Sequence, residues 1–200
     1  MAPLTIDDLL PLEVYAPRRR EFFDSHRRYI DRFRRVRIGP RLTLIFENRQ
    51  TLWFRVQETV RVARISDRHE VEQELNLYNR LLPDHHLLQA ALLIDLPDDA
   101  IRELAHWRRL EGDQLRLVVD GEELPARLMT CRPEDRCAGT AHWVQFAFDF
   151  HFRDLLADLT RSAEFVFDNP FYSHRSAPLP DELRQSLSED LEVDAVAVAH

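Results

Sequence analysis

The segment that decides the fold spans residues 47–79 and reads ENRQTLWFRVQETVRVARISDRHEVEQELNLYN. It predicts a turn, a strand and then two short helices. Polar side chains stand at the ends or on the faces of these otherwise apolar elements. Burying such groups without a partner costs about 1–3 kcal/mol each. We therefore expect partners for all of them: Glu47, Asn48, Arg49, Gln57, Glu58, Glu74, Tyr78 and Asn79.

Two β-hairpins are expected in the chain. The first covers 41–57: RLTLIFE (41–47) alternates like a strand, Asn48-Arg49-Gln50 turns, and TLWFRVQ (51–57) returns. The second covers 114–129, with Asp120-Gly121 at its turn. These hairpins are mixed with helical segments, and no βαβ rhythm is visible. The fold class is therefore α+β, with a mostly antiparallel sheet packed by several short helices.

The N-terminal part predicts a helix over residues 17–35 with a strongly basic surface. Its apolar face is marked by Phe22, His26, Tyr29 and Phe33, at spacings of four, three and four. Arginines occupy most of the rest, in a chain whose formal net charge is −8. That charge disfavours non-specific binding of nucleic acid. The basic helix is either a solvated surface that pairs with the acidic remainder, or a docking surface for an acidic protein or for the chain's own C-terminal segment.

Residues 1–176 are expected to form a single α+β domain. Residues 177–200 read as an acidic C-terminal tail that begins with prolines and is partly disordered, with a helix expected to about Ser188 and a frayed end after it. The start shows no secretory pattern, no apolar run approaches membrane-spanning length, and the two cysteines fit a reducing compartment. We expect a cytoplasmic protein that does not bind membranes.

The best candidate for a metal site is a dispersed set of two carboxylates and two imidazoles. Fe, Mn and Zn all accept such mixed oxygen and nitrogen ligands. No HExxH, ExxH or paired-histidine spacing supports the set, and the alternative is that its members are hydrogen-bonding residues of the core, with the glutamates paired to arginine. The set comprises Glu58, Glu74, His142 and His174.

Other reactive side chains carry weaker hypotheses. Cys131 and Cys137, in CRPEDRC, have arginine neighbours that could lower a thiol pKa, so a redox-responsive pair is one interpretation and ordinary loop cysteines are the other. The adjacent His85 and His86 are expected to face solvent. The absence of lysine from the chain excludes Schiff-base catalysis and the phosphate-binding lysine of nucleotide-binding loops.

Several segments together resemble an uncharacterised bacterial family known only as a domain of unknown function. They include LTIDDLLPLEVY (4–15), GPRLTLIFENRQT (39–51), AHW (141–143) and NPFYSH (169–174), and the resemblance extends to about residue 176. Two further matching segments are VQE (56–58) and the pattern EL..YN.L.P (74–83). The matching segments hold the polar residues of 47–79 listed first, the four candidate metal ligands and also Tyr172, whereas the two cysteines, His85 and His86 lie outside them. Asn169 stands where the pattern leads us to expect a histidine, which removes one potential metal ligand.

The resemblance implies a gene neighbourhood, because genes of that family are often encoded beside those for rubrerythrin and for an iron–sulfur protein like a heterodisulfide reductase subunit. The resemblance therefore implies an accessory protein of an oxidative-stress or iron-redox system, with a transition metal as its candidate ligand and a redox protein as its candidate partner. Two alternatives stay open. One is a non-enzymatic interaction module that docks through the arginine-rich helix, and the other is a thiol-based redox regulator. Whether the protein is an enzyme is left open.

Overall fold

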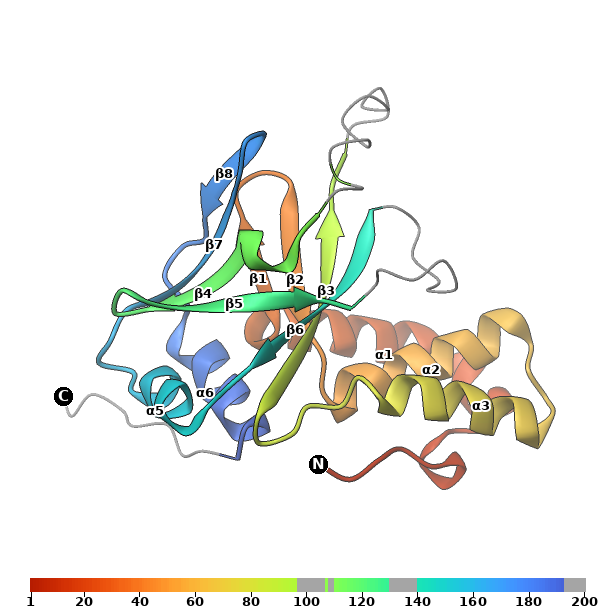
Figure 1. Ribbon diagram of the computed structural model, residues 1–200. Helices are drawn as coiled ribbons and strands as arrows, with labels where there is room; N and C mark the ends of the chain where they lie inside the picture. The colour runs from red at the N-terminus through yellow and green to blue at the C-terminus, as the bar shows by residue number, and fades with distance from the viewer. Residues whose placement is uncertain (97–106, 108–109, 130–139, 193–200) are drawn as a thin grey trace.

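The structure, a computed structural model, describes residues 1–96, 107, 110–129 and 140–192 (Figure 1). Within these residues, strands pair antiparallel in the spatial order β1-β2-β3-β6-β5-β4-β7-β8. The expected α+β class and its mostly antiparallel sheet are confirmed. The strands are β1 (Arg35–Ile38), β2 (Leu42–Phe46), β3 (Leu87–Ile94), β4 (Leu115–Val119), β5 (Glu122–Leu128), β6 (Ala141–Ala147), β7 (Ala163–Asn169) and β8 (Tyr172–Arg175).

The sheet curls until its two ends meet, so that it is nearly closed and barrel-like. An isolated bridge joins Ile38 at the end of β1 to Ser176 just after β8. Tyr172 strengthens this closure, because its hydroxyl donates to the carbonyl oxygen of Ile38 at 2.6 Å and accepts from the backbone N–H of Arg41 at 3.1 Å. The turn between β1 and β2 is thereby tied to β8.

Phenylalanine side chains fill the inside of the curled sheet. Phe46, Phe146 and Phe165 come from β2, β6 and β7, and their ring centroids lie 5.4–6.0 Å apart. All three are at most 1% exposed. Strands that are distant in the sheet order therefore meet through their side chains, as expected for a closely packed interior.

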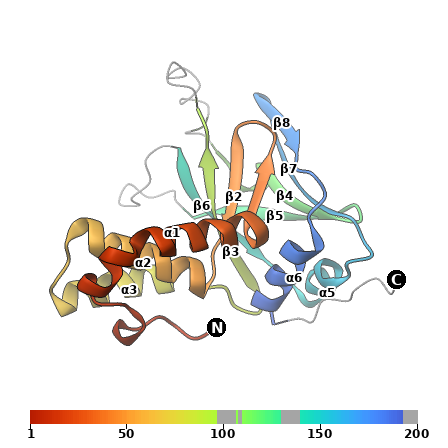
Figure 2. The same ribbon diagram turned by 180° about the vertical axis from the view of Figure 1, so that it is seen from behind.

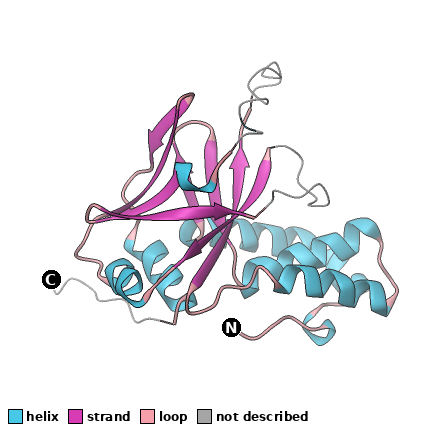
Figure 3. Cartoon of the chain, viewed as in Figure 1, coloured by secondary structure: helices cyan, strands magenta, loops and turns pink. Residues whose placement is uncertain are grey.

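The helices form two groups (Figures 1 and 3). Helices α1 (Leu12–Phe33), α2 (Arg49–Ala63) and α3 (Arg68–Asn79) run side by side next to the sheet, and the helical turn η1 (Ile6–Asp8) precedes them. Leu52, Val56 and Leu75 of this group form a second apolar cluster, against which Trp143 of β6 packs. Helices α5 (Phe150–Ala157) and α6 (Asp181–Asp190) lie together at one end of the sheet, and the turn η2 (Gly112–Gln114) precedes β4.

The predicted hairpin over 41–57 is wrong, because residues 49–63 are helical. Asn48 is the N-cap of α2, and its side chain accepts hydrogen bonds from the backbone N–H groups of Gln50 and Thr51, both at 3.1 Å. Thr51 returns the contact by accepting from the N–H of Asn48 at 2.9 Å. This reciprocal cap satisfies donors that a helix start leaves open. The strand β2 pairs instead with β1 and β3.

The second predicted hairpin, over 114–129, is confirmed as β4 and β5. Asp120 and Gly121 form its turn with φ values of 52° and 87°. Positive φ at both central residues is the geometry that Asp-Gly favours in two-residue hairpin loops.

The helix expected in the C-terminal segment is present, but up to residue 192 this segment is packed into the core and is not a tail. Residues 181–190 form α6, and Leu183, Leu187 and Leu191 are at most 1% exposed in the main core. Arg184, also buried, donates to the carbonyl oxygens of Leu156 and Asp158 at the C-terminal end of α5. The expected boundary near residue 176 therefore does not delimit the domain. Residues 193–200 lie outside the described part of the chain.

None of the described helices is long and apolar enough to cross a membrane.

The closure of the sheet gives a first prediction. Gly39 has φ +61°, and a Cβ there would overlap the hydroxyl of Tyr172 and the ring of His174. Gly39→Ala should therefore lower the free energy of unfolding by about 2 kcal/mol or more, as measured by urea denaturation. Gly121→Ala is the matched control, because Gly121 also has a positive φ but nothing lies within 4 Å of a Cβ there. Equal losses in both variants would contradict a steric role for the contact with Tyr172.

Candidate functional site

The four predicted metal ligands lie on four separate elements. Glu58 is on α2, Glu74 on α3, His142 on β6 and His174 on β8. In the sheet order, β6 and β8 are four positions apart whichever way one counts around the nearly closed sheet. The two histidines therefore belong to opposite walls. Among the described residues, no group of three or more His, Cys, Asp or Glu side chains is placed to hold a metal ion. The structure does not bring the four residues together.

Glu58 is engaged by a cluster between α1 and α2. Tyr15 donates its hydroxyl to Glu58 at 2.8 Å, and Arg19 and Arg61 donate at 2.8 and 3.0 Å. Burial raises the pKa of Glu58, but the hydrogen bonds from Arg61, Arg19 and Tyr15 outweigh it and hold the pKa at about 2. The carboxylate is thus ionised at neutral pH and accepts hydrogen bonds on both oxygens. Its role in this geometry is to join α1 to α2.

Glu47 and Asn48 lie where the chain passes from β2 into α2, and both are hydrogen-bonded there. Glu47 is fully buried, and it accepts a hydrogen bond from the hydroxyl of Thr51 at 2.6 Å. Arg55 neutralises it with a guanidinium nitrogen 2.6 Å from its other oxygen, and the same guanidinium lies over the ring of Trp143. The buried charge is therefore paired, as a buried carboxylate must be.

Three further polar candidates of the 47–79 segment, Arg49, Gln57 and Asn79, fix the N-terminal residues 4–10. Gln57 both donates to and accepts from the backbone of Leu10, at 2.9 Å in each case. Asn79 does the same with Leu4, at 2.8 and 2.9 Å. Arg49 forms an ion pair with Asp8 at 2.7 Å. Tyr78 hydrogen-bonds Thr59 at 3.1 Å and so links α3 to α2. These side chains are structural.

A buried network that the sequence analysis did not find lies where α1, α2 and α6 meet. Its centre is Arg34, which is 2% exposed and pairs with Asp190 of α6. Arg34 also donates to the hydroxyl of Ser186 at 2.7 Å and to that of Tyr29 at 2.9 Å. Asn48 donates to the same tyrosine oxygen at 2.8 Å. Burial raises the pKa of Asp190, against the opposing effect of Arg34.

A pocket of about 560 Å³ opens above this network. Its rim carries Arg32, Phe33, Glu182, Gln185 and Glu189, and its floor includes Tyr29, Arg34, Asn48, Ser186 and Asp190. The floor groups are hydrogen-bonded to one another, so the network holds the joint between helices together. No sequence signal marked it, because Arg34 stands in an arginine run and Asp190 in an acidic run.

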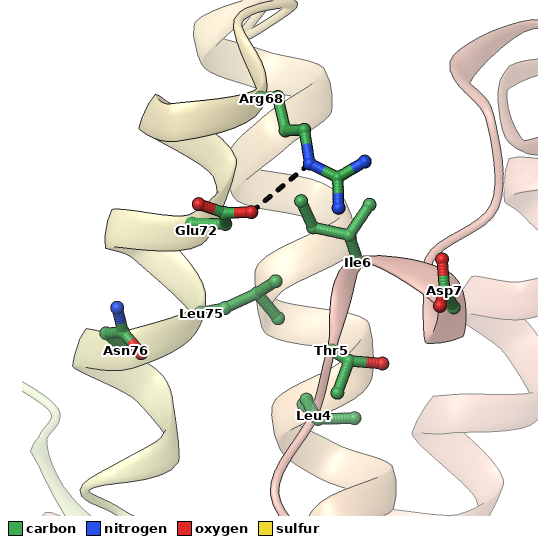
Figure 4. A pocket seen from close by; sticks show the side chains of 8 residues that line it. All are labelled: Leu4, Thr5, Ile6, Asp7, Arg68, Glu72, Leu75 and Asn76. Atoms are coloured by element: carbon green, nitrogen blue, oxygen red, sulfur yellow. Dashed lines mark hydrogen bonds and ion pairs between the residues drawn. The ribbon is translucent and has the colours of Figure 1, made fainter.

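A smaller pocket of about 320 Å³ lies between the N-terminal residues 4–7 and α3 (Figure 4). Leu4, Ile6 and Leu75 give it apolar walls, and the ion pair of Arg68 with Glu72, at 3.2 Å, lies along one side. Its lining contains no histidine or cysteine. The arrangement offers neither a nucleophile with an adjacent base nor a set of metal ligands.

Helix α1 lies toward the viewer in Figure 2, and its arginines differ in how far they are paired with carboxylates. Most arginines of the basic segment are engaged: Arg18 with Glu21, Arg19 with Glu58, Arg32 with Glu182, Arg34 with Asp190, and Arg35 with Asp31. Within the part of the chain that the structure describes, Arg20 and Arg28 form no ion pair, and Arg27 reaches Asp31 only at 3.9 Å. Phe23, in the same region, is 41% exposed.

The other reactive candidates add no site. His85 and His86 lie in the loop before β3 with ring centroids 4.5 Å apart, and His86 meets the edge of the exposed Phe150. Cys131 and Cys137 lie outside the described residues.

Comparisons with known proteins match nearly the whole chain. Residues 3–191 match the model of a family described as "Protein of unknown function (DUF3501)". The chain is also similar to the crystal structure of a novel protein of unknown function from Burkholderia pseudomallei K96243, with 28% identity and a TM-score of 0.83 over 96% of this chain and 100% of that one. No curated protein matches the sequence. The family match runs through α6, so this helix lies within the residues that the family model covers.

The buried pair at the helix joint gives a second prediction. Asp190→Ala should lower the free energy of unfolding by about 3 kcal/mol, because it leaves the guanidinium of Arg34 buried without its carboxylate. Glu182→Ala is the matched control, since it removes a carboxylate of the same helix from an ion pair whose side chains are 61% and 52% exposed. That control should cost well under about 1 kcal/mol. Similar losses in the two variants would contradict a central role for Arg34.

A third prediction concerns acid stability. Burial, with a smaller effect from Arg55, lowers the pKa of His26 from 6.5 to about 4. The unfolded chain therefore takes up this proton before the folded protein does, and the free energy of unfolding should fall as the pH drops from 6.5 to 4. Glu58, with its pKa lowered from 4.5 to about 2, adds a second loss between pH 4.5 and 2.

Replacing His26 should remove only the loss of stability between pH 6.5 and 4. His26→Phe keeps a ring against Phe54, on which the imidazole stacks at 3.9 Å, and should flatten the stability curve between pH 6.5 and 4 by about 2 kcal/mol after allowing for partial exposure. Denaturant titrations at several pH values measure it. His69→Gln, on the exposed side of α3, is the control and should leave the curve unchanged. A curve for His26→Phe that matches the wild type would show that His26 does not control this window.

Proposed function

This chain belongs to the DUF3501 family, and we propose that it is a non-enzymatic accessory protein that binds an acidic protein partner through the outward face of α1. The observation that carries the proposal is the set of exposed arginines on this helix together with the exposed ring of Phe23. The partner, in this proposal, belongs to a cytoplasmic peroxide-defence or iron-redox system. Support for that context is the gene neighbourhood that the family resemblance implies.

The surface has the chemistry of a protein interface. Arginine and aromatic side chains are enriched among the residues that dominate binding energy. Phe23 is exposed beside Arg19, whose guanidinium lies 5.8 Å from its ring centroid. The chain as a whole is acidic, with a net charge of −8, so a basic face on one helix sets the orientation in which an acidic partner approaches.

A metal-dependent function finds less support in the same geometry. Both oxygens of Glu58 accept hydrogen bonds from Arg19 or Arg61, and ligation of a metal would require these arginines to withdraw. Glu74, His142 and His174 lie on other elements. A binding function needs no such rearrangement, because the residues of α1 are already exposed.

The fourth prediction tests the proposed function by charge reversal. Arg20→Glu/Arg27→Glu should weaken binding to the candidate partners that the family resemblance implies, a rubrerythrin or a heterodisulfide-reductase-like iron–sulfur protein, at least 10-fold, because it reverses the charges that would face the partner. Co-expression followed by titration of the purified proteins measures the affinity. Circular dichroism and urea denaturation check that the fold is intact.

The matched control is Arg64→Glu/Arg80→Glu, which makes the same change of charge at exposed positions at the ends of α2 and α3. This control should bind like the wild type. Absence of binding by the wild-type chain to either protein, or equal affinity of both double variants, would refute the proposed docking.

A further inference from the structure

The exposed arginines of α1 form a regular row. Ala16, Arg20, Phe23 and Arg27 follow one another at spacings of four, three and four residues, and all four are exposed. Residues with this spacing lie on one face of a helix. The row covers about three turns, or roughly 16 Å at 1.5 Å per residue. It is a narrow surface with one large apolar side chain between two cations.

Phe23 is held in place from below. Its ring centroid lies 6.3 Å from that of Phe54 on α2, and Phe54 in turn stacks on His26 at 3.9 Å. Phe54 is only 8% exposed, so it forms the base on which the exposed Phe23 rests. An apolar side chain that is already fixed loses little conformational entropy on binding. Phe23 is therefore suited to be the anchor of an interface.

The chain itself shows what α1 binds. Helix α6 has four acidic side chains, Asp181, Glu182, Glu189 and Asp190, and it packs against the C-terminal part of α1. Arg32 pairs with Glu182, and Arg34, just beyond the end of α1, pairs with Asp190. The basic segment thus already binds carboxylates presented by a helix, and Arg20 and Arg27 offer the same chemistry farther along it.

We infer that the row formed by Ala16, Arg20, Phe23 and Arg27 binds an acidic amphipathic helix of the partner protein, which places carboxylates against the arginines and an apolar side chain against Phe23. This inference rests on the proposed function and specifies the partner's binding element. The acidic neighbours Asp24 and Asp31 are exposed beside the row. They repel a uniform polyanion, so nucleic acid and anionic membranes fit this surface less well than a helix with spaced carboxylates.

The test uses the full chain and two synthetic peptides of identical composition. One is a 14-residue amphipathic helix, about four turns, built from Glu, Leu and Ala with a fluorescent label and two prolines at its N-terminal end. The other has the two prolines moved to its centre, where they break the helix. The helical peptide should bind at least 10-fold more tightly than its isomer in fluorescence anisotropy.

Variants of the chain locate the binding surface. Phe23→Ala should weaken binding of the helical peptide about 10-fold or more, as expected for an aromatic anchor, and Arg20→Glu/Arg27→Glu should do the same. Arg64→Glu/Arg80→Glu should have no effect. Equal binding of the two peptides, or tighter binding of a DNA duplex or of vesicles containing phosphatidylserine, would overturn the inference.

The result separates the inference from the proposed function. If neither peptide binds, but charge reversal of Arg20 and Arg27 abolishes binding of the partner protein, the inference of a helical ligand is wrong and the docking function stands. If the helical peptide binds this row while the partner protein ignores the charge reversal, the inference stands and the proposed function is wrong.

Discussion

The rest of the structure depends on keeping the buried charge of Arg34 compensated. A guanidinium that is 2% exposed needs a carboxylate and further acceptors, and Tyr29 of α1 together with Ser186 and Asp190 of α6 supply them. Asn48 joins this network by donating to the hydroxyl of Tyr29. Asn48 also caps α2, so one side chain serves both the helix start and the network. The contact between the helices, the start of α2 and the position of α6 therefore depend on the same set of hydrogen bonds.

Short sequence patterns correctly predicted those elements whose conformation depends on neighbouring residues. The Asp120-Gly121 hairpin follows from turn chemistry, and the basic helix follows from its apolar spacing, although it begins at Leu12 rather than Pro17. The strand predicted for residues 51–57 is wrong. The alternation of apolar and polar residues there fits a strand, but Asn48 caps a helix that begins at Arg49. The leucines of α6 were overlooked because their acidic neighbours dominate the composition of that segment.

The candidate site could be predicted only in part, for a topological reason. The expectation that the polar residues of 47–79 have partners was right for those whose hydrogen bonds are described above. Their partners, such as Leu10 for Gln57 and Leu4 for Asn79, lie 47 and 75 residues away, and no sequence spacing reveals them. Whether His142 and His174 come together depends on the strand order, and that order places β6 and β8 on opposite walls of the curled sheet. Inward polar groups therefore serve assembly, and the outward row of α1 is the surface for which we propose a role in recognition.

The closure of the sheet has a consequence for the time course of synthesis. Ile38 meets Ser176 and Arg34 meets Asp190, so residues made early are completed by residues made late. While the chain is still on the ribosome, the first strand lacks its closing neighbour and the arginine stays hydrated, because its carboxylate has not yet been made. Contacts of such high sequence separation slow folding, because the loop between the partners must close first. The domain thus acquires its finished form only after translation has passed α6, and any factor that protects the nascent chain must act until then.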